Sequence, residues 1–251
     1  MLKDDKRIRI IVGHYGSGKT EFAVNYAIRL SKEIREQNEA NGESRKVAIA
    51  DIDVVNPYFR SREKEDLLME HDIESFSSIL KNSALDLPAI AADITKPVFN
   101  TDYEYIIDVG GDDVGARVLG RMSKDISRFE YDMFMVINKN REYTDTLEKV
   151  IQYISDIERT SGLKVTGLVS NTHMLWDTSE KDITDGIELV KEVEIKTGIP
   201  MRYVTYWEKK SDFRKTISHN LKYSKNNTQF RQIDPDNVNM PVSMIMREEW
   251  M

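Results

Sequence analysis

The sequence predicts an α/β fold in which a mainly parallel, twisted sheet carries helices on both faces. Short runs rich in β-branched apolar residues recur along the 251 residues behind turn signals, as buried strands do. Most of these runs are separated by segments long enough for a crossover helix, which is the connection that parallel strands require. The runs expected to form strands are 8–12, 47–50, 105–109, 133–137, 165–169 and 202–205.

Two of the connecting segments carry the apolar period of a helix. Behind the first run, apolar residues fall at i, i+3, i+4, i+7 and i+11 and so share one helical face. A second stripe of this kind begins near Thr144. The stripes consist of Ala23, Tyr26, Ala27, Leu30 and Ile34, and of Leu147, Val150, Ile151, Ile154 and Ile157. Asn41-Gly42 marks the loop that closes the first helix, and Gly198-Ile199-Pro200 precedes the last predicted strand.

Composition sets the expected domain organisation. From about residue 224 the chain turns to Asn, Gln and Asp with Pro235 and Pro241, which favours a peripheral segment over another strand and helix. We predict one α/β domain over residues 1–223 and a peripheral C-terminal extension over residues 224–251. The region 77–100 has apolar residues without a clean period, so no element is predicted there.

Charge and residue usage exclude several classes of protein. The net charge of −7 argues against a general attraction to nucleic acid, which needs clustered Lys and Arg. The absence of cysteine excludes disulfides, thiolate catalysis and cysteine-ligated metals, and it fits a reducing compartment. No apolar run approaches the roughly 20 residues of a membrane span, and the N-terminus lacks a secretory signal. We therefore expect a cytoplasmic protein without membrane attachment.

A glycine-rich stretch stands directly behind the first predicted strand. Residues 13–20 read GHYGSGKT and match the pattern G-x-x-x-x-G-K-[ST]. Its glycines let successive backbone N–H groups converge on a β-phosphate, and the helix that follows adds its positive end. Lys19 then reaches the β and γ oxygens, and the Thr20 hydroxyl is placed to bind Mg²⁺. The alternative is a glycine-rich turn that binds nothing.

The nucleotide contacts expected from this loop are Gly13, His14, Tyr15, Gly16, Ser17, Gly18, Lys19, Thr20 and Glu21.

Acidic residues follow two further predicted strands. Asp51 and Asp53 end one strand, and Asp108 ends another before Gly110 and Gly111. The carboxyl ends of parallel strands meet at one edge of a sheet, which is where a phosphate loop needs acids to hold a metal and position a nucleophile. Gly110 and Gly111 would let the backbone approach the γ-phosphate and move when it leaves. The alternatives are a strand-end cap for Asp108 and a turn for Asp51 and Asp53.

These motifs resemble a class of P-loop NTPases that includes the Min and Par positioning ATPases, the nitrogenase iron protein, and the dethiobiotin synthetase and cobyrinate amidase enzymes. The resemblance covers roughly residues 7–220 and implies a P-loop NTPase fold that binds ATP and Mg²⁺. It implies metal binding by Thr20, Asp51, Asp53 and Asp108. It also implies catalytic roles for Lys19 and for Asp53, which would lie near the attacking water.

The resemblance also extends to base recognition. The class uses an asparagine after a late strand, and Asn171 resembles that position. An amide can donate to and accept from an adenine edge, whereas guanine is usually chosen by an acid. The segment 138–141, Asn-Lys-Asn-Arg, resembles the GTPase signature N-K-x-D, but Arg141 replaces the aspartate. The sequence therefore favours adenine, with a turn residue as the alternative for Asn171.

One position departs from the Min and Par pattern. Those ATPases carry a lysine after the first loop glycine that reaches the phosphates of a dimer partner, and here His14 stands in that place, followed by Tyr15. Replacement cations close in sequence to the predicted switch segments are Arg60, Arg62 and Arg117, with a solvated surface role as the alternative. Tyr58 and Phe59, which follow Asp53, are expected either to meet a partner or substrate or to pack in the core.

Two classes of function remain open. In the first, ATP and Mg²⁺ order the loops after Asp53 and Asp108, hydrolysis releases them, and a protein partner or a second copy reads the difference. In the second, a synthetase-type enzyme transfers the γ-phosphoryl group to a small-molecule carboxylate. A nucleotide-binding subunit with little turnover is a third reading. A basic cluster of Lys209, Lys210, Arg214, Lys215, Lys222 and Lys225 is read as a solvated helix and tail or as a contact for an anionic surface.

Overall fold

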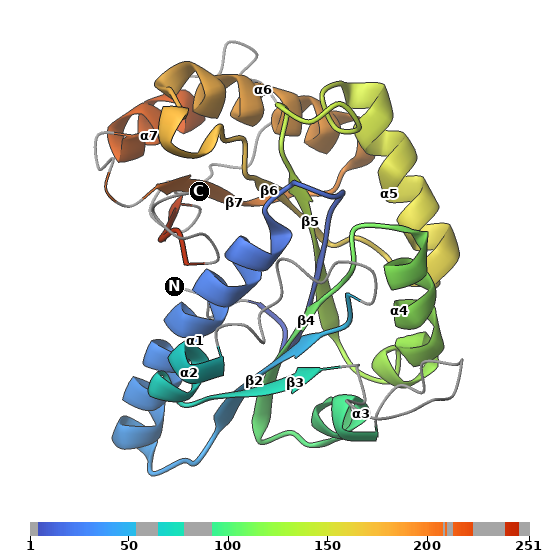
Figure 1. Ribbon diagram of the computed structural model, residues 1–251, viewed down its shortest axis with the longest axis vertical. Helices are drawn as coiled ribbons and strands as arrows, with labels where there is room; N and C mark the ends of the chain where they lie inside the picture. Colours follow the sequence, from blue (N-terminus) through green and yellow to red (C-terminus); the bar gives the residue numbers. More distant parts are fainter. Residues whose placement is uncertain are drawn as a thin grey trace.

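The predicted α/β fold class is confirmed by a computed structural model, which describes residues 5–53, 65–77, 92–207, 209, 213–222 and 239–245. Its strands form one eight-stranded sheet in the order β3-β2-β4-β1-β5-β6-β7-β8, and every pair of neighbours is parallel (Figure 1). The strands are β1 (Ile8–Val12), β2 (Lys46–Asp51), β3 (Ile73–Ser77), β4 (Tyr103–Asp108), β5 (Tyr131–Ile137), β6 (Gly167–Ser170), β7 (Met201–Trp207) and β8 (Asn239–Val242).

Helices cover both faces of the sheet. The described helices are α1 (Lys19–Asn41), α2 (Glu65–Glu70), α3 (Ala92–Phe99), α4 (Asp113–Ile126), α5 (Leu147–Ser161), α6 (Glu180–Thr197) and α7 (Phe213–Lys222), with a 3-10 turn at Leu175–Asp177. Alternate residues of β1 enter different cores: Ile10 packs with α3 to α7, and Ile11 packs with α1 and α2. Burial on both faces explains why the strands read as continuous apolar runs.

The first predicted helix follows its pattern closely. All five apolar residues of the stripe from Ala23 to Ile34 are buried in the core beneath α1. In α5, Val150, Ile154 and Ile157 are buried, whereas Leu147 and Ile151 are only partly covered. None of the helices in the described part of the chain combines the length and apolar character needed to cross a bilayer.

Strand β1 lies at the centre of the sheet, between β4 and β5. Ile8 pairs with Tyr105 on one side and with Tyr131 on the other. Strand β2 lies on the far side of β4, where Asp51 is in register with Asp108. This order brings the carboxyl ends of β1, β2 and β4, with the loops that follow them, to one edge of the sheet.

The structure describes residues 239–245 of the predicted C-terminal extension, and they pack against the domain. Residues 239–242 form β8, which pairs with β7, and the residues that follow contact α1. Asn25 Nδ2 donates to the Ser243 carbonyl at 2.9 Å, and the Ser243 amide donates to Asn25 Oδ1 at 2.7 Å. The Ile245 amide donates to Glu21 Oε1 at 2.5 Å. A short strand with a central proline, Pro241, reads as a turn in the sequence because it lacks an N–H for the ladder.

Candidate functional site

A tight loop joins β1 to α1 at the sheet centre. Gly16 has a φ of 77° and Gly18 a φ of 82°, the left-handed conformation that glycine adopts without steric cost. The Ser17 amide donates to the His14 carbonyl at 3.0 Å, and the Phe22 amide donates to the Gly18 carbonyl at 2.9 Å to begin the helix. The free N–H groups of the first helical turn thus point into the bend, an arrangement suited to an anion.

The segment after β4 packs directly on this loop. A Cβ atom at Gly111 would lie 2.7 Å from the Tyr15 amide nitrogen and 3.1 Å from the Gly13 carbonyl oxygen. A Cβ atom at Gly110 would lie 3.2 Å from Asp53 Oδ1. Gly111 therefore allows a backbone approach to the loop that a residue with a Cβ atom would not permit without displacement, and Gly110 packs closely on the Asp53 side chain.

The predicted acids lie together beside the loop. Asp51, Asp53 and Asp108 are all buried, as is Lys19. Lys19 Nζ lies 3.9 Å from Asp53 Oδ2, and Asp51 Oδ1 accepts from the Asp53 amide at 2.9 Å. The Thr20 hydroxyl lies beside the Asp108 carboxyl group and favours its charged form. The fold thus brings side chains from β4, the end of β2 and the start of α1 to one place.

Three buried carboxyl groups influence one another in this group of side chains. Burial raises the pKa of Asp108 to about 7, the nearby Asp51 and Asp53 carboxylates raise it as well, and Lys19 and the Thr20 hydroxyl oppose the rise. In the part of the chain that the structure describes, the Lys19 ammonium lies near Asp53 and lowers the pKa of Asp108. A divalent cation bound beside these carboxyl oxygens would stabilise their charged forms further.

The oxygen donors fit Mg²⁺. Asp108 Oδ1 is buried and accepts no hydrogen bond from the described residues. Within the same part of the chain, no group of three or more His, Cys, Asp or Glu side chains is arranged as a complete metal site. Magnesium does not require one, because it usually keeps several waters and binds through one or two carboxylates plus substrate phosphates. Thr20 and Asp108 match that need.

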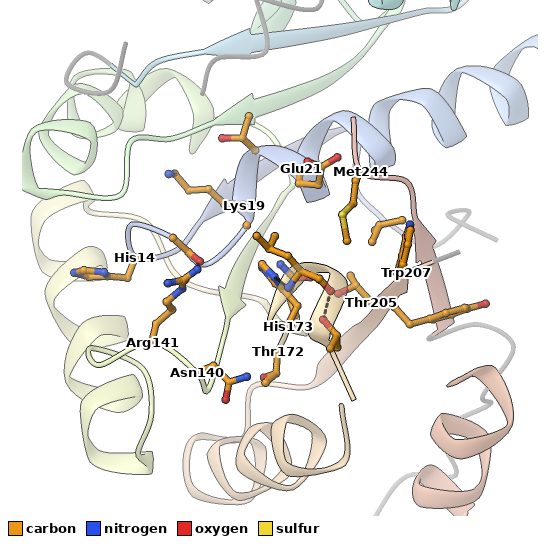
Figure 2. Close-up of a pocket in the computed structure, with 18 of the residues that line it drawn as sticks. His14, Lys19, Glu21, Asn140, Arg141, Thr172, His173, Thr205, Trp207 and Met244 are labelled. Atoms are coloured by element: carbon orange, nitrogen blue, oxygen red, sulfur yellow. Dashed lines mark hydrogen bonds between the residues drawn. The ribbon is translucent and has the colours of Figure 1, made fainter. Parts of the chain in front are cut away.

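A cavity of about 610 Å³ opens next to the loop (Figure 2). This volume is typical of sites for small molecules and cofactors. One end is bounded by the loop and Lys19, and the other by the end of β7 and the segment after β8. Lining residues that the sequence did not mark as ligand contacts include Arg141, His173, Thr205, Trp207 and Met244. They come from separate strand ends, so only the sheet order brings them together.

The Asn171 side chain is hydrogen-bonded to the backbone of the loop. Its side-chain Nδ2 donates to the Ser17 carbonyl at 2.6 Å, and its Oδ1 accepts from the Thr205 hydroxyl. A Cβ atom at Gly18 would lie 2.4 Å from Asn171 Nδ2, so the amide fills the space beneath that glycine. Asn171 lines the cavity, and one of its amide hydrogens remains for a ligand. Base recognition by Asn171 stays a prediction.

His14 and Tyr15 occupy the outer side of the loop. The His14 ring stacks on Tyr143, with centroids 4.3 Å apart, and meets the edge of Tyr153 at 5.6 Å. Figure 2 shows the His14 side chain directed away from Lys19 and the other labelled residues. Tyr15 is 61% exposed. His14 is thus engaged within its own chain, in contrast to a lysine that reaches a partner.

A second cavity of about 580 Å³ lies on this outer side, between α4 and α5. It shares His14, Tyr15 and Tyr143 with the first cavity. Its wall includes Gly111 and Tyr153, whose hydroxyl donates to the Gly111 carbonyl at 3.4 Å.

The remaining sequence predictions concern residues outside the described ranges or exposed positions on the described helices and loops. Tyr58, Phe59, Arg60 and Arg62 lie outside the described residues, as do Lys210 and Lys225. Arg117 is exposed on α4. Of the predicted basic cluster, Lys209, Arg214 and Lys215 are exposed.

Comparisons with known proteins give similar structures only. Protein-family models give no match, and curated protein sequences give none either. The signal recognition particle receptor FtsY from Elizabethkingia anophelis aligns over 80% of this chain and 59% of its own, at 18% identity and a TM-score of 0.44. Its complex with GDP aligns over 79% and 56%, at 17% identity and a TM-score of 0.46.

A third solved structure is the nucleotide-binding protein from Archaeoglobus fulgidus in complex with ADP. It aligns over 86% of both chains, at 16% identity and a TM-score of 0.43. This chain spans less than two thirds of the FtsY chains. Matches at this level of similarity assign neither a family nor a function.

Proposed function

We propose that this protein is a Mg²⁺-dependent ATP-binding protein and ATPase that acts as a nucleotide-driven switch. One observation carries the proposal: the loop of residues 13–20, which lines a 610 Å³ cavity, has Lys19 and three buried aspartates from neighbouring strand ends beside it. A phosphate-binding loop, a cation and acids at the carboxyl edge of a parallel sheet are the parts that phosphoryl transfer needs.

Each residue of the site has a role in this proposal. The amides of the loop bind the β-phosphate, and Lys19 contacts the β and γ oxygens. Thr20 and Asp108 hold Mg²⁺, with Asp51 supporting them, and the metal neutralises charge on the phosphates when it is bound. Asp53 orients the attacking water. The cavity end formed by Asn171, Thr205 and Trp207 accepts the base, with a preference for adenine.

The contact between Gly111 and the phosphate loop supports the switch. Because the backbone at Gly111 lies against Tyr15, a γ-phosphate held by the loop would also meet the segment after β4. Loss of that phosphate would release the segment and change the surface around α4. A protein partner or a second copy of the chain would bind one of the two states. We propose that this cycle operates in the cytoplasm.

A nucleotide-binding assay tests the proposal directly. Titration with ATP, with and without Mg²⁺, should give saturable binding that is weakened by EDTA, and phosphate release should accompany it. Light scattering in ATP and in ADP should show a nucleotide-dependent change of mass, alone or with a partner. Absence of ATP binding in the presence of Mg²⁺ would refute the proposal.

The second cavity favours the alternative, a synthetase-type enzyme that phosphorylates a small-molecule carboxylate. Such an enzyme needs a second substrate beside the γ-phosphate, and the cavity between α4 and α5 reaches Gly111 and His14. In this case phosphate release from ATP would appear only when a carboxylate substrate is added. ATP turnover in its absence, with a change of mass, favours the switch.

A further inference from the structure

We propose that Arg141 is a phosphate-binding residue of this site and supplies, from within the chain, positive charge that His14 does not. The inference rests on the proposed nucleotide-binding function and names a further residue for it. Arg141 belongs to the segment after β5, in which it occupies the position of an aspartate in the guanine-binding signature. The structure gives it a different place, at the phosphate loop.

The Arg141 side chain is anchored on the loop itself. Its Nε donates to the Gly16 carbonyl at 3.0 Å, and Figure 2 shows the side chain extending from its own segment toward the loop. A Cβ atom at Gly16 would lie 3.1 Å from Arg141 Nε. The absence of a side chain at Gly16 therefore provides the space that the guanidinium group occupies. The Nε bond fixes the plane of the guanidinium and leaves both Nη groups available.

The backbone that carries Arg141 is held by a network of hydrogen bonds. The Arg141 amide donates to the Asn138 carbonyl at 3.1 Å, and the Thr144 amide donates to the Arg141 carbonyl at 2.9 Å. Asn138 is fully buried, and its Oδ1 accepts from the Asn140 amide at 3.0 Å. A guanidinium on such a fixed turn loses little conformational entropy when it binds a ligand.

The positive charge of Arg141 also favours a bound anion. Arg141 is half-buried, lines the 610 Å³ cavity, and forms no ion pair with any carboxylate in the described ranges. Lys19, a second basic side chain at this end of the cavity, already lies near Asp53. A half-buried guanidinium that no described carboxylate pairs with, beside a phosphate-binding loop, is an electrostatic arrangement that an anionic ligand completes.

His14 does not provide this charge. Its ring is stacked on Tyr143 and directed away from Lys19, and histidine is only partly charged near neutral pH. Arginine is always charged and binds phosphate oxygens through two parallel N–H donors. The geometry thus assigns Arg141, and not His14, to the phosphates of the bound nucleotide.

The test compares ATP affinity of Arg141→Ala, Arg141→Lys and Lys139→Ala with that of the native chain at low and high salt. Arg141→Ala should weaken ATP binding roughly 10- to 100-fold at low salt, the range for a charge-assisted hydrogen bond, and less at high salt because exposed charges are screened. Arg141→Lys should recover part of the loss. Lys139→Ala removes a charge from the same segment outside the cavity and should bind as the native chain does.

Two results would overturn the assignment. One is native ATP affinity in Arg141→Ala. The other is a loss that is equal at low and high salt and is not recovered by lysine, which is the result expected if Arg141 only braces Gly16. Thermal unfolding of each variant separates these outcomes from a folding defect. Failure of the function itself is distinguishable, because then the native chain would not bind ATP and Lys19→Ala would change nothing.

Discussion

The backbone at Gly111 lies against the amide of Tyr15 so closely that a Cβ atom there would be 2.7 Å from the nitrogen. Real Cβ atoms do not make contacts this short, so a side chain at Gly111 must displace the loop. The segment after β4 and the loop after β1 are thus in direct backbone contact, and a shift of one displaces the other. The two residues are far apart in the sequence.

Gly111→Ala is expected to reduce nucleotide affinity because the new methyl group moves the loop. Gly42→Ala is the matched control, since nothing lies within 4 Å of its added Cβ and it stands at the far end of α1. The control should lose about 1 kcal/mol of stability through its positive φ and keep its affinity. Calorimetric titration and thermal unfolding measure both quantities. Equal affinity in the two variants would contradict the predicted coupling.

Lys19→Ala is expected to remove ATP binding or to weaken it at least 100-fold. The ammonium is buried at the loop, where a lost charge-assisted contact costs about 3 kcal/mol. The measurement is binding of a fluorescent ATP analogue, with Lys46→Ala, an exposed lysine in β2, as the control. Unchanged affinity would exclude the loop as a phosphate site.

Asp53→Asn is expected to keep ATP binding within a few-fold while hydrolysis falls by about 100-fold or more, the range for loss of a general base. The amide keeps the shape of the side chain but neither accepts a proton nor pairs with Lys19, 3.9 Å away. Single-turnover phosphate release measures the chemical step apart from binding. Native turnover in this variant would assign the water-orienting role to another residue.

Thr205→Val tests the support beneath the loop. The variant removes only the hydroxyl that donates to Asn171 Oδ1, and Asn171 holds the Ser17 carbonyl. Because the Thr205 hydroxyl orients the Asn171 amide, ATP affinity should fall by about 5-fold, the usual effect of one neutral hydrogen bond. Asn171→Ala should lower ATP and GTP affinity and also reduce the preference for ATP. If the ratio of ATP affinity to GTP affinity is unchanged in Asn171→Ala, Asn171 supports the loop and does not recognise the base.

The start of α6 should show a pH-dependent contribution to stability. Burial alone would raise the pKa of Asp182, but hydrogen bonds from the Ser179 hydroxyl and amide and from Asn140 Nδ2 outweigh it, so the pKa lies below the ordinary 3.8. Because the folded pKa is depressed, this contribution is fully present above pH 3.8 and is lost as the pH falls through the lower folded value.

Asp182→Asn should therefore lower the free energy of unfolding at pH 7 by about 0.5 to 1 kcal/mol, the usual size of a charge effect at a helix N-terminus. The difference from the native chain should shrink in acid. Urea unfolding at both pH values measures it. Glu188→Gln, on the same helix beyond its first turn, is the control and should show no such pH dependence.

The sequence predicts the centre of this sheet better than its edges. The run 8–12 coincides with β1, and the other predicted strands overlap β2, β4, β5, β6 and β7. These strands are buried on both faces, so their apolar character is plain. Strand β3 carries Glu74 and two serines, and β8 contains Pro241, so neither shows that signal. Pairing at an edge depends on the neighbouring strand, which local composition does not encode.

Some residues of the candidate site belong to local sequence motifs, and others are placed only by the fold. The glycine-rich loop and the acids at strand ends are local motifs, and the structure brings Lys19, Asp53 and Asp108 together beside the loop. The places of Arg141, Thr205 and Met244 follow from strand order and from the return of the chain along α1, which no short motif records. Arg141 shows this most clearly, because in the sequence it is only the residue that breaks a familiar signature.

The central position of β1 also has a consequence for biogenesis. Ile8 pairs with Tyr105 and Tyr131, so β1 cannot acquire both neighbours until synthesis has passed residue 131. Until then at least one edge of β1 lacks its partner strand, and such unpaired apolar strands favour aggregation or chaperone binding. The loop that follows β1 consequently takes its final form late, only after the nascent chain has delivered both flanking strands.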